Sequence, residues 1–259
     1  MLLEVKDLNI SLTSEKSVAE HISFRLGQGE MLSIVGSSGA GKTTICKAIM
    51  GLLGNTYRAD GEILFQGEDL LDLQERKRQT IYGKEICLIM QNPMTAFNPS
   101  IRVGRQMEKT YLLHHGKTPR QEMQRLFAAI LQKLGLEDTQ RILNSYPFTL
   151  SGGMLQRLMI AAALMCQPAL LVADEATTAI DACNRIGLMR ELKSFCKDGM
   201  SVLFVTHDLR SASVSDRILV MDRGQIVEQG KTEQILNTPK EDYTKYLLNA
   251  CRLERREMS

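Results

Sequence analysis

Residues 36–43 read Gly-Ser-Ser-Gly-Ala-Gly-Lys-Thr, a pattern suited to binding phosphate. They fit G-x-x-x-x-G-K-[ST], the phosphate-binding loop or P-loop, and they follow the apolar residues 31–35 as such a loop follows a strand. Glycines let successive backbone N–H groups turn toward one anion without Cβ clashes, and the helix that follows adds the positive end of its dipole. Lys42 can reach the β- and γ-phosphates, and the Thr43 hydroxyl can bind Mg2+. The loop predicts a binding site for ATP or GTP.

Two carboxylates follow a second apolar stretch. Asp174 and Glu175 come directly after residues 169–173, and the C-terminal end of a strand is where an open α/β sheet exposes its ligand site. Asp174 can hold the Mg2+ shell through water. Glu175, one residue further on, points differently and can polarise the water that attacks the γ-phosphate. Together with the P-loop, this pair predicts nucleotide hydrolysis.

Residues 151–153 predict a second anion site that has no lysine of its own. Ser151 can cap a helix, while Gly152 and Gly153 leave the first backbone amides of that helix bare. The apolar residues of the helix share one side: Leu155, Leu158, Met159 and Ala162. On local grounds alone an ordinary capped helix explains this segment better, so the functional interpretation depends on the other motifs.

Apolar patterning predicts the strands and helices that position these residues. Predicted strands cover residues 3–10, 22–26, 31–35, 61–65, 85–90, 169–173 and 202–206, with a hairpin at 218–227 that turns at Asp222-Arg223-Gly224. Helices are predicted at 186–195 and 237–249. Strands that alternate with helices favour an α/β fold with a mainly parallel sheet.

The middle of the chain has a helical pattern. Thr118 is predicted to cap one helix, with Pro119 at its first position and Gln121 at the capping-box position. Apolar residues then follow the 3, 4, 7, 8 spacing of one helix face, and Gly135 ends the helix. We expect a helical subdomain at about residues 101–149, inserted in the α/β core.

Composition limits the classes of partner. The net charge is only +2, so no global field favours nucleic acid or acidic lipid. The six cysteines form no C-x-x-C and several lie in apolar runs, which favours reduced thiols in a cytosolic compartment. No secretion signal is evident, and no apolar run approaches the roughly 18 residues of a membrane span. Work at a membrane would therefore need a partner that spans it.

The order of the motifs resembles the ATP-binding subunits of ABC transporters over essentially the whole chain. The matching motifs are residues 36–43, Gln91, residues 150–153, Asp174-Glu175, residues 179–181 and His207. The resemblance implies an α/β P-loop NTPase cassette with a mainly parallel core, antiparallel N-terminal strands and an inserted helical subdomain. It implies one ABC ATPase domain over residues 1–259, with its core at 1–100 and 150–250.

The same resemblance implies a role for each site residue. Glu175 is the expected general base, His207 the switch contact to the γ-phosphate, and Gln91 the sensor of Mg2+ and of a transmembrane partner. Expected Mg2+ ligands are Thr43, Gln91 and Asp174. Expected ATP contacts are Gly36, Ser37, Ser38, Gly39, Ala40, Gly41, Lys42, Thr43, Thr44, Ser151, Gly152, Gly153 and Asp181, the last crossing a dimer interface.

Partners also follow from the resemblance. Two cassettes stack head to tail in that family, with ATP between the P-loop of one and the Ser151 helix of the other. We therefore expect a second ABC ATPase subunit of different sequence, two transmembrane permease subunits and an extracytoplasmic solute-binding protein, and no nucleic acid. The expected location is the cytoplasmic face of the membrane.

Three longer segments give a finer resemblance. Residues 90–99, 146–157 and 238–244 are similar to the peptide and nickel uptake group, and the form Gly-Gly-Met-Leu-Gln-Arg is closest to its nickel subunits. This implies an importer of nickel or a metal–chelator complex, with di- or oligopeptide import as the alternative.

Two other classes of function stay open. An ABC ATPase of translation or DNA repair would usually carry a second cassette or a long coiled-coil insert. A clamp that binds ATP and scarcely hydrolyses it is suggested by two departures from the family pattern. Leu12-Thr13-Ser14 lacks the ring that often stacks on adenine, and Met154 stands where Gln is frequent. A third departure, Ala176 in place of Pro, removes neither a phosphate donor nor the base.

Overall fold

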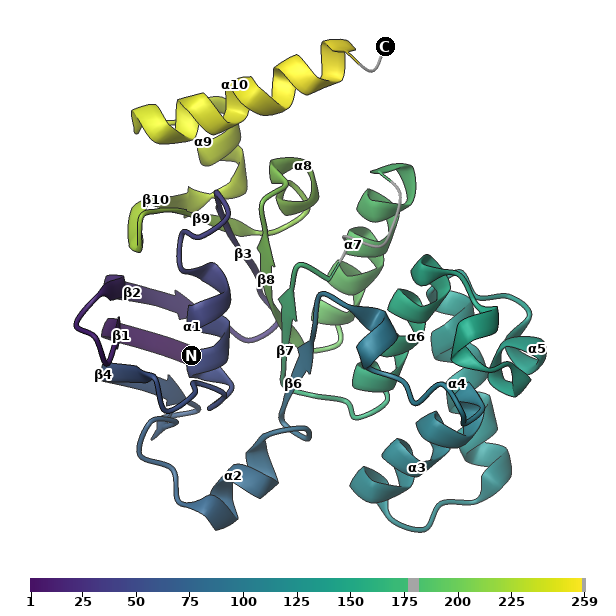
Figure 1. Cartoon of the computed structure of the whole chain (residues 1–259). Helices are drawn as coiled ribbons and strands as arrows, with labels where there is room; N and C mark the ends of the chain where they lie inside the picture. The colour runs from purple at the N-terminus through teal and green to yellow at the C-terminus, as the bar shows by residue number, and fades with distance from the viewer. Residues whose placement is uncertain (177–181, 258–259) are drawn as a thin grey trace.

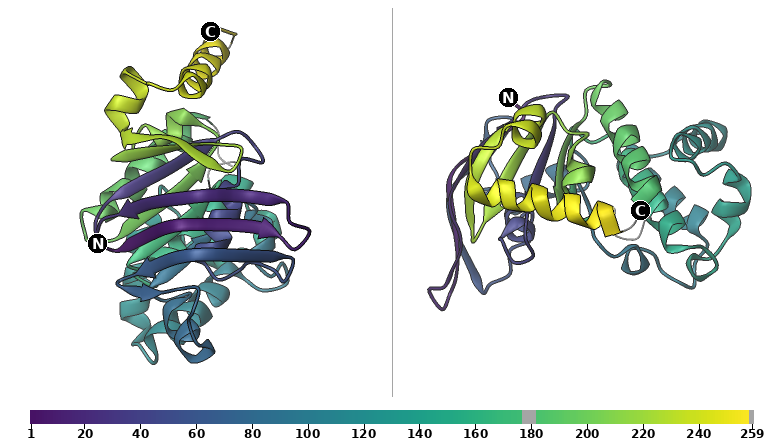
Figure 2. Two further views of the ribbon diagram at one scale, coloured as in Figure 1. Left: turned by 90° about the vertical axis from the view of Figure 1, so that its left-hand side faces the viewer. Right: turned by 90° about the horizontal axis from the view of Figure 1, so that it is seen from above.

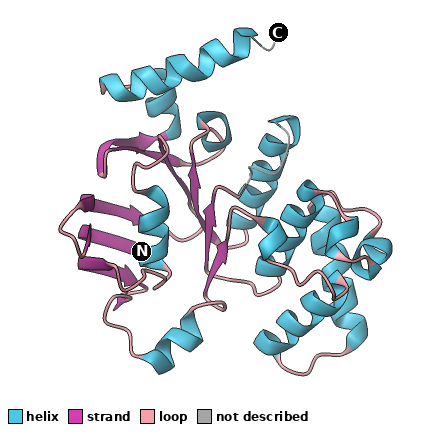
Figure 3. Ribbon diagram, in the orientation of Figure 1, coloured by secondary structure: helices cyan, strands magenta, loops and turns pink. Residues whose placement is uncertain are grey.

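A computed structural model describes residues 1–176 and 182–257 of the chain. Two β-sheets lie on either side of helix α1 (Lys42–Ile49), and a group of helices lies beside the larger sheet (Figures 1 and 3). The expected α/β cassette fold, with antiparallel N-terminal strands and a mainly parallel core, is confirmed.

The larger sheet has six strands in the order β10-β9-β3-β8-β7-β6. Their bounds are β3 (Met31–Gly36), β6 (Ile86–Ile89), β7 (Leu170–Asp174), β8 (Ser201–Thr206), β9 (Arg217–Asp222) and β10 (Gln225–Lys231). All neighbours run parallel except the β9–β10 hairpin. Every residue of β3 and β8 is buried, as expected for central strands covered on both faces. The carboxyl ends of β6, β7 and β8 therefore meet along one edge.

The smaller sheet is antiparallel, in the order β2-β1-β4-β5. Its strands are β1 (Leu3–Leu12), β2 (Ser17–Leu26), β4 (Tyr57–Phe65) and β5 (Glu68–Asp69). Alternate residues of β1 and β2 are buried, and with Ile45 and Ile49 of α1 they form one apolar cluster that also contains Leu32 and Ile34 of β3. Helix α1 is thus enclosed between two sheets, which fixes the start of the helix against the end of β3.

The remaining helices are α2 (Glu75–Ile81), α3 (Val103–His115), α4 (Arg120–Lys133), α5 (Thr139–Asn144), α6 (Gly152–Leu164), α7 (Ala182–Cys196), α8 (Leu209–Ala212), α9 (Thr232–Asn237) and α10 (Asp242–Glu257), with short 3-10 turns at Pro93–Thr95 and Pro147–Thr149. The predicted Thr118 cap is wrong: α4 begins at Arg120, and its N-cap Pro119 has no side chain that can accept a hydrogen bond. The predicted stop is confirmed, because α4 ends at Lys133 and Gly135 has a φ of 71°.

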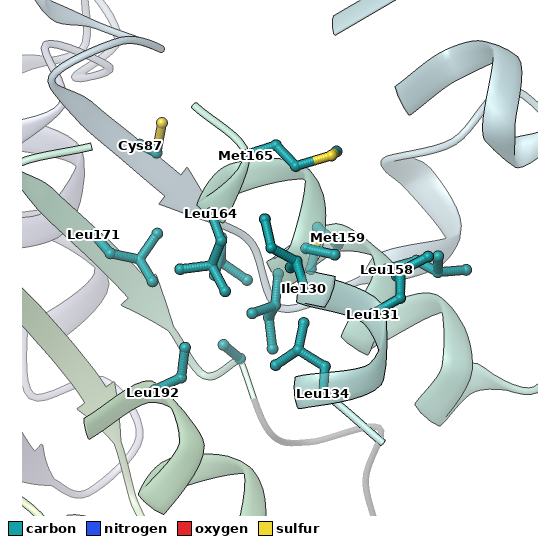
Figure 4. Packing of buried hydrophobic residues seen from close by; sticks show 14 of the residues in the cluster. Cys87, Ile130, Leu131, Leu134, Leu158, Met159, Leu164, Met165, Leu171 and Leu192 are labelled. Atoms are coloured by element: carbon teal, nitrogen blue, oxygen red, sulfur yellow. The ribbon is translucent and has the colours of Figure 1, made fainter. Parts of the chain in front are cut away.

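Helices α3 to α6 pack on a second apolar cluster that reaches the face of the larger sheet opposite α1. Figure 4 shows Leu131 of α4 beside Leu158 of α6, with Leu134 just past the end of α4. Leu171 of β7 lies at the other side of the same cluster, beyond Leu164 of α6. The helical region is therefore continuous with the core on which it rests.

Arg157 of α6 ties the end of α4 to this cluster. Its Nη1 donates a hydrogen bond to the Leu134 carbonyl at 2.6 Å, at a helix end where carbonyls lack partners in their own helix. A Cβ on Gly135 would overlap this same nitrogen, and the positive φ of Gly135 disfavours any other residue.

Gly135→Ala should therefore destabilise the protein by about 2 kcal/mol, because the strained φ and the displaced Arg157 contact add. Thermal unfolding should show a melting temperature lower by about 4–8 °C. Gly187→Ala is the matched control, because Gly187 lies inside α7 and nothing stands within 4 Å of its added Cβ. Equal melting temperatures for the two variants would contradict this account.

The C-terminal part is a hairpin followed by two helices. The predicted turn at 222–224 is confirmed, with φ of 44° at Arg223 and 83° at Gly224. The helix predicted at 237–249 is confirmed over 242–249, but its start is wrong: α9 ends at Asn237, and α10 begins at Asp242 and extends across one end of the molecule (Figure 2). Across the described ranges, no helix combines the length and apolar character needed to cross a bilayer.

Candidate functional site

The P-loop joins β3 to α1, where the sequence predicted it. Gly41 is the N-cap of α1 with a φ of 93°, and a Cβ there would stand 2.8 Å from the Val18 carbonyl oxygen, so only glycine fits. The side chain of Lys42 is buried and folds back on the loop, with Nζ donating to the carbonyls of Gly36 at 2.8 Å and Ser37 at 2.7 Å. Burial lowers the pKa of Lys42, and the nearby Glu175 and Asp174 carboxylates only partly oppose this.

Thr43 and Asp174 come together across the gap between α1 and β7. The Thr43 hydroxyl donates to Asp174 Oδ1 at 3.1 Å. Burial raises the pKa of Asp174, with a smaller contribution from Glu175, while Thr43 and Lys42 oppose the rise. The Thr43 hydroxyl oxygen and the partly buried Asp174 carboxylate are hard oxygen ligands, the kind that Mg2+ prefers.

Gln91, Glu175 and His207 form a group at the carboxyl edge of the sheet. They follow β6, β7 and β8, three neighbouring strands. Gln91 Nε2 donates to Glu175 Oε2 at 2.7 Å, and His207 Nδ1 lies 3.2 Å from Glu175 Oε1. Glu175 has a φ of 49°, an uncommon conformation for a non-glycine residue. Gln91 and His207 therefore each contact a different oxygen of the Glu175 carboxylate.

The residues at the start of α6 are placed apart from this group. Ser151 caps α6 as predicted, its hydroxyl oxygen accepting from the Met154 N–H at 3.2 Å. Within the described residues no hydrogen bond joins Ser151, Gly152 or Gly153 to the P-loop. Asp181 lies outside the described residues.

Sequence reasoning missed Asp208, which fixes the chain directly after His207. The Asp208 carboxylate caps α8 by accepting from the Arg210 N–H at 2.9 Å, and it also accepts from Ser211 Oγ and Arg185 Nη1. Burial alone would raise the pKa of Asp208, but these hydrogen bonds outweigh it and the pKa lies below its ordinary value. An aspartate after a strand and before a helix is an N-cap signal that could have found this residue.

Comparisons with known proteins agree with this geometry. A family model described as ABC transporter matches residues 19–178. The metal-staphylopine import system ATP-binding protein CntD of Staphylococcus aureus is 41% identical over 251 residues, which cover 96% of this chain and 92% of CntD. The oligopeptide transport ATP-binding protein OppD of Bacillus subtilis is 41% identical over 254 residues, which cover 95% of this chain and 71% of OppD.

A solved structure with the same architecture is the dimeric ATP-binding cassette MJ0796 in a post-hydrolysis state bound to ADP and Pi. It aligns with a TM-score of 0.78 at 27% identity and covers 89% of this chain and 99% of that one. The P-loop between two sheets and the polar edge of the larger sheet define an ATP-binding cassette. The chain belongs to the ABC transporter family, and it is an ATPase whose hydrolysis is coupled to transport.

Proposed function

We propose that this protein is the ATP-hydrolysing subunit that energises an ABC importer, with Glu175 as the general base. The observation that carries the proposal is the placement of Gln91, Glu175 and His207 on three adjacent strand ends, on the same sheet as the P-loop. A positioned base of this kind needs to lie within hydrogen-bond reach of the attacking water. Gln91 and His207 orient the Glu175 carboxylate for that purpose.

The P-loop side chains prepare the phosphate site. Lys42 Nζ donates hydrogen bonds to the carbonyls of Gly36 and Ser37. We propose that β- and γ-phosphate oxygens replace these carbonyls, and that the amides of residues 38–44 bind the same phosphates. The depressed pKa of Lys42 returns toward its usual value when this anion arrives, because an adjacent negative charge favours the ammonium form.

Thr43, Asp174 and Gln91 are the proposed Mg2+ ligands, with Asp174 binding through water. Mg2+ bound there would neutralise charge that develops on the transferred phosphoryl group. The Asp174 carboxylate and the Thr43 hydroxyl would hold that cation, and the hydrogen bond between them already places the two side chains together.

Asp174→Asn should remove the Mg2+-dependent part of ATP binding and hydrolysis, because an amide oxygen is a weaker donor without charge. ATP titrations in Mg2+ and in EDTA separate the effects: affinity should fall about tenfold or more in Mg2+ and stay unchanged in EDTA. Asp198→Asn, at an exposed carboxylate beyond α7, should match the wild type in both buffers. A similar loss in EDTA would show that Asp174 serves the loop itself and not the cation.

The second ATP contact is proposed to come from a partner cassette. Ser151, Gly152 and Gly153 lie at the start of α6, and among the described residues no hydrogen bond joins them to their own P-loop. An ATP held between this chain's loop and the partner's equivalent helix would close the pair, and hydrolysis would reopen it. We propose that Asp181 is a residue of that interface and that the partner cassette has a different sequence. We also propose that residues 1–259 form one ATPase domain, with its helical insert at about 101–149.

The proposed cargo is nickel or a metal–chelator complex, and di- or oligopeptides are the second candidate. CntD, named for metal–staphylopine import, supports the first, and OppD, named for oligopeptide transport, supports the second. We propose that other subunits recognise the cargo. Those subunits are two permeases and a solute-binding protein, with this chain at the cytoplasmic membrane face.

Uptake by a deletion strain tests the proposed function. Loss of this gene should abolish high-affinity uptake of labelled nickel with or without a chelator, while uptake of a labelled dipeptide and an oligopeptide continues. The reverse pattern would identify a peptide importer. Complementation with the wild-type gene should restore uptake, and complementation with Glu175→Gln should not. Normal uptake of all these solutes in the deletion strain would contradict the importer assignment.

A further inference from the structure

Tyr243 of α10 makes a contact to the P-loop that the mechanism above does not use. The Tyr243 hydroxyl oxygen accepts a hydrogen bond from the Ser37 N–H at 3.1 Å, across 206 positions of sequence. Ser37 is the first loop residue after β3. The contact joins the C-terminal helix to the point where the chain leaves the sheet to surround a nucleotide.

The Ser37 residue is held from both its amide and its carbonyl. Its carbonyl oxygen accepts from Lys42 Nζ at 2.7 Å and from the Ala40 N–H at 3.3 Å, while its amide donates to Tyr243. A triphosphate that binds Lys42, as proposed above, would remove one of these contacts. The amide contact to Tyr243 does not involve Lys42, so it can hold the loop before and after the nucleotide arrives.

Tyr243 is itself fixed by the hairpin that precedes it. Glu228 on β10 accepts from the Lys240 N–H at 2.9 Å and from the Glu241 N–H at 3.2 Å, which anchors the start of α10. The next residue, Thr244, is fully buried. The Tyr243 ring packs against an apolar cluster that includes Val35 of β3, the residue two before Ser37. The anchored start of α10 and the packed ring therefore place the Tyr243 hydroxyl beside the loop.

We propose that Tyr243 is a positioning residue that holds the entrance of the P-loop in the shape that accepts a triphosphate. It acts through Ser37 and does not touch the reacting atoms. The inference rests on the proposed ATP contacts at residues 36–44. Loss of one neutral hydrogen bond corresponds to a change in ATP affinity of about three- to tenfold.

The test compares Tyr243→Phe with Tyr246→Phe in the full chain, assembled with its transporter partners for turnover. Tyr246 lies on the same helix and is 67% exposed, so its variant loses the same hydroxyl without losing a loop contact. Tyr243→Phe should weaken binding of ATP and ADP and raise KM for ATP by about three- to tenfold, with kcat changed by less than about twofold. Hydrogen exchange in the nucleotide-free protein should be faster at residues 36–41. Tyr246→Phe should match the wild type in every measurement.

An unchanged KM and unchanged loop exchange in Tyr243→Phe would overturn the inference. A lower melting temperature with an unchanged KM would do the same, because it would assign the hydroxyl to stability alone. Lys42→Ala in the same titrations separates this failure from failure of the ATP site: normal ATP binding by that variant would refute the site itself. Lost binding in Lys42→Ala with normal Tyr243→Phe would refute only the role of Tyr243.

Discussion

Glu175→Gln should lower ATP turnover by about a hundred- to ten-thousandfold while ATP remains bound, because it removes a general base and leaves the phosphate-binding groups intact. The glutamine keeps a carbonyl oxygen that can accept from Gln91, so the fold of the strand end is preserved. Phosphate release measures turnover, and equilibrium binding of labelled ATP measures occupancy. With the partner cassette present, the variant should accumulate as a closed, ATP-loaded pair.

Glu85→Gln is the matched control. Glu85 is exposed and precedes β6, at the opposite end of the sheet from Glu175, so the same change of charge there should leave turnover unaltered. Turnover near the wild-type rate in Glu175→Gln would remove Glu175 from the mechanism. A joint loss of turnover and ATP binding would show instead that the carboxylate supports the nucleotide site as a whole.

Lys42→Ala should reduce ATP affinity about a hundredfold or more, since at least two charge-assisted hydrogen bonds to phosphate oxygens are lost. The loss should be larger for ATP than for ADP, because Lys42 is placed to reach the γ-phosphate as well as the β-phosphate. Calorimetric or fluorescence titration with both nucleotides measures the difference.

Lys47→Ala is the matched control, because it removes the same charge from the same helix as Lys42→Ala. Lys47 lies on the same helix α1 but is exposed, so its loss should change ATP affinity less than about twofold. Equal losses in the two variants would show that general positive charge near α1, and not the placement of Lys42, attracts the nucleotide.

Local patterns predicted most of the elements but not every boundary. The P-loop, the Ser151 cap and the hairpin turn at 222–224 were predicted because each depends on the backbone preferences of a few adjacent residues. The Thr118 cap was wrong because Pro119 takes an extended ψ of 131° and the helix starts after it. The helix predicted over 237–249 starts only at Asp242, because the N–H groups of Lys240 and Glu241 donate to Glu228 on another element.

The contacts among Gln91, Glu175 and His207 could not be predicted from local sequence patterns. Each residue could be assigned to a strand end from the sequence, but the distances of 2.7 Å and 3.2 Å depend on β6, β7 and β8 being neighbours in that order. When long helical segments separate the strands in the sequence, local sequence patterns do not show which strands are neighbours in the sheet. The family resemblance supplied the roles, and the folded sheet supplied the contacts.

The amino-acid sequence by itself determined a glycine-rich phosphate loop, two carboxylates at a strand end and a capped helix, because these properties follow from the conformations open to adjacent residues. Only the tertiary structure decided that Gln91 and His207 share Glu175, and that Tyr243 reaches Ser37. Such contacts join residues far apart in the chain, and they form only when buried apolar clusters fix the order of the strands and the course of α10.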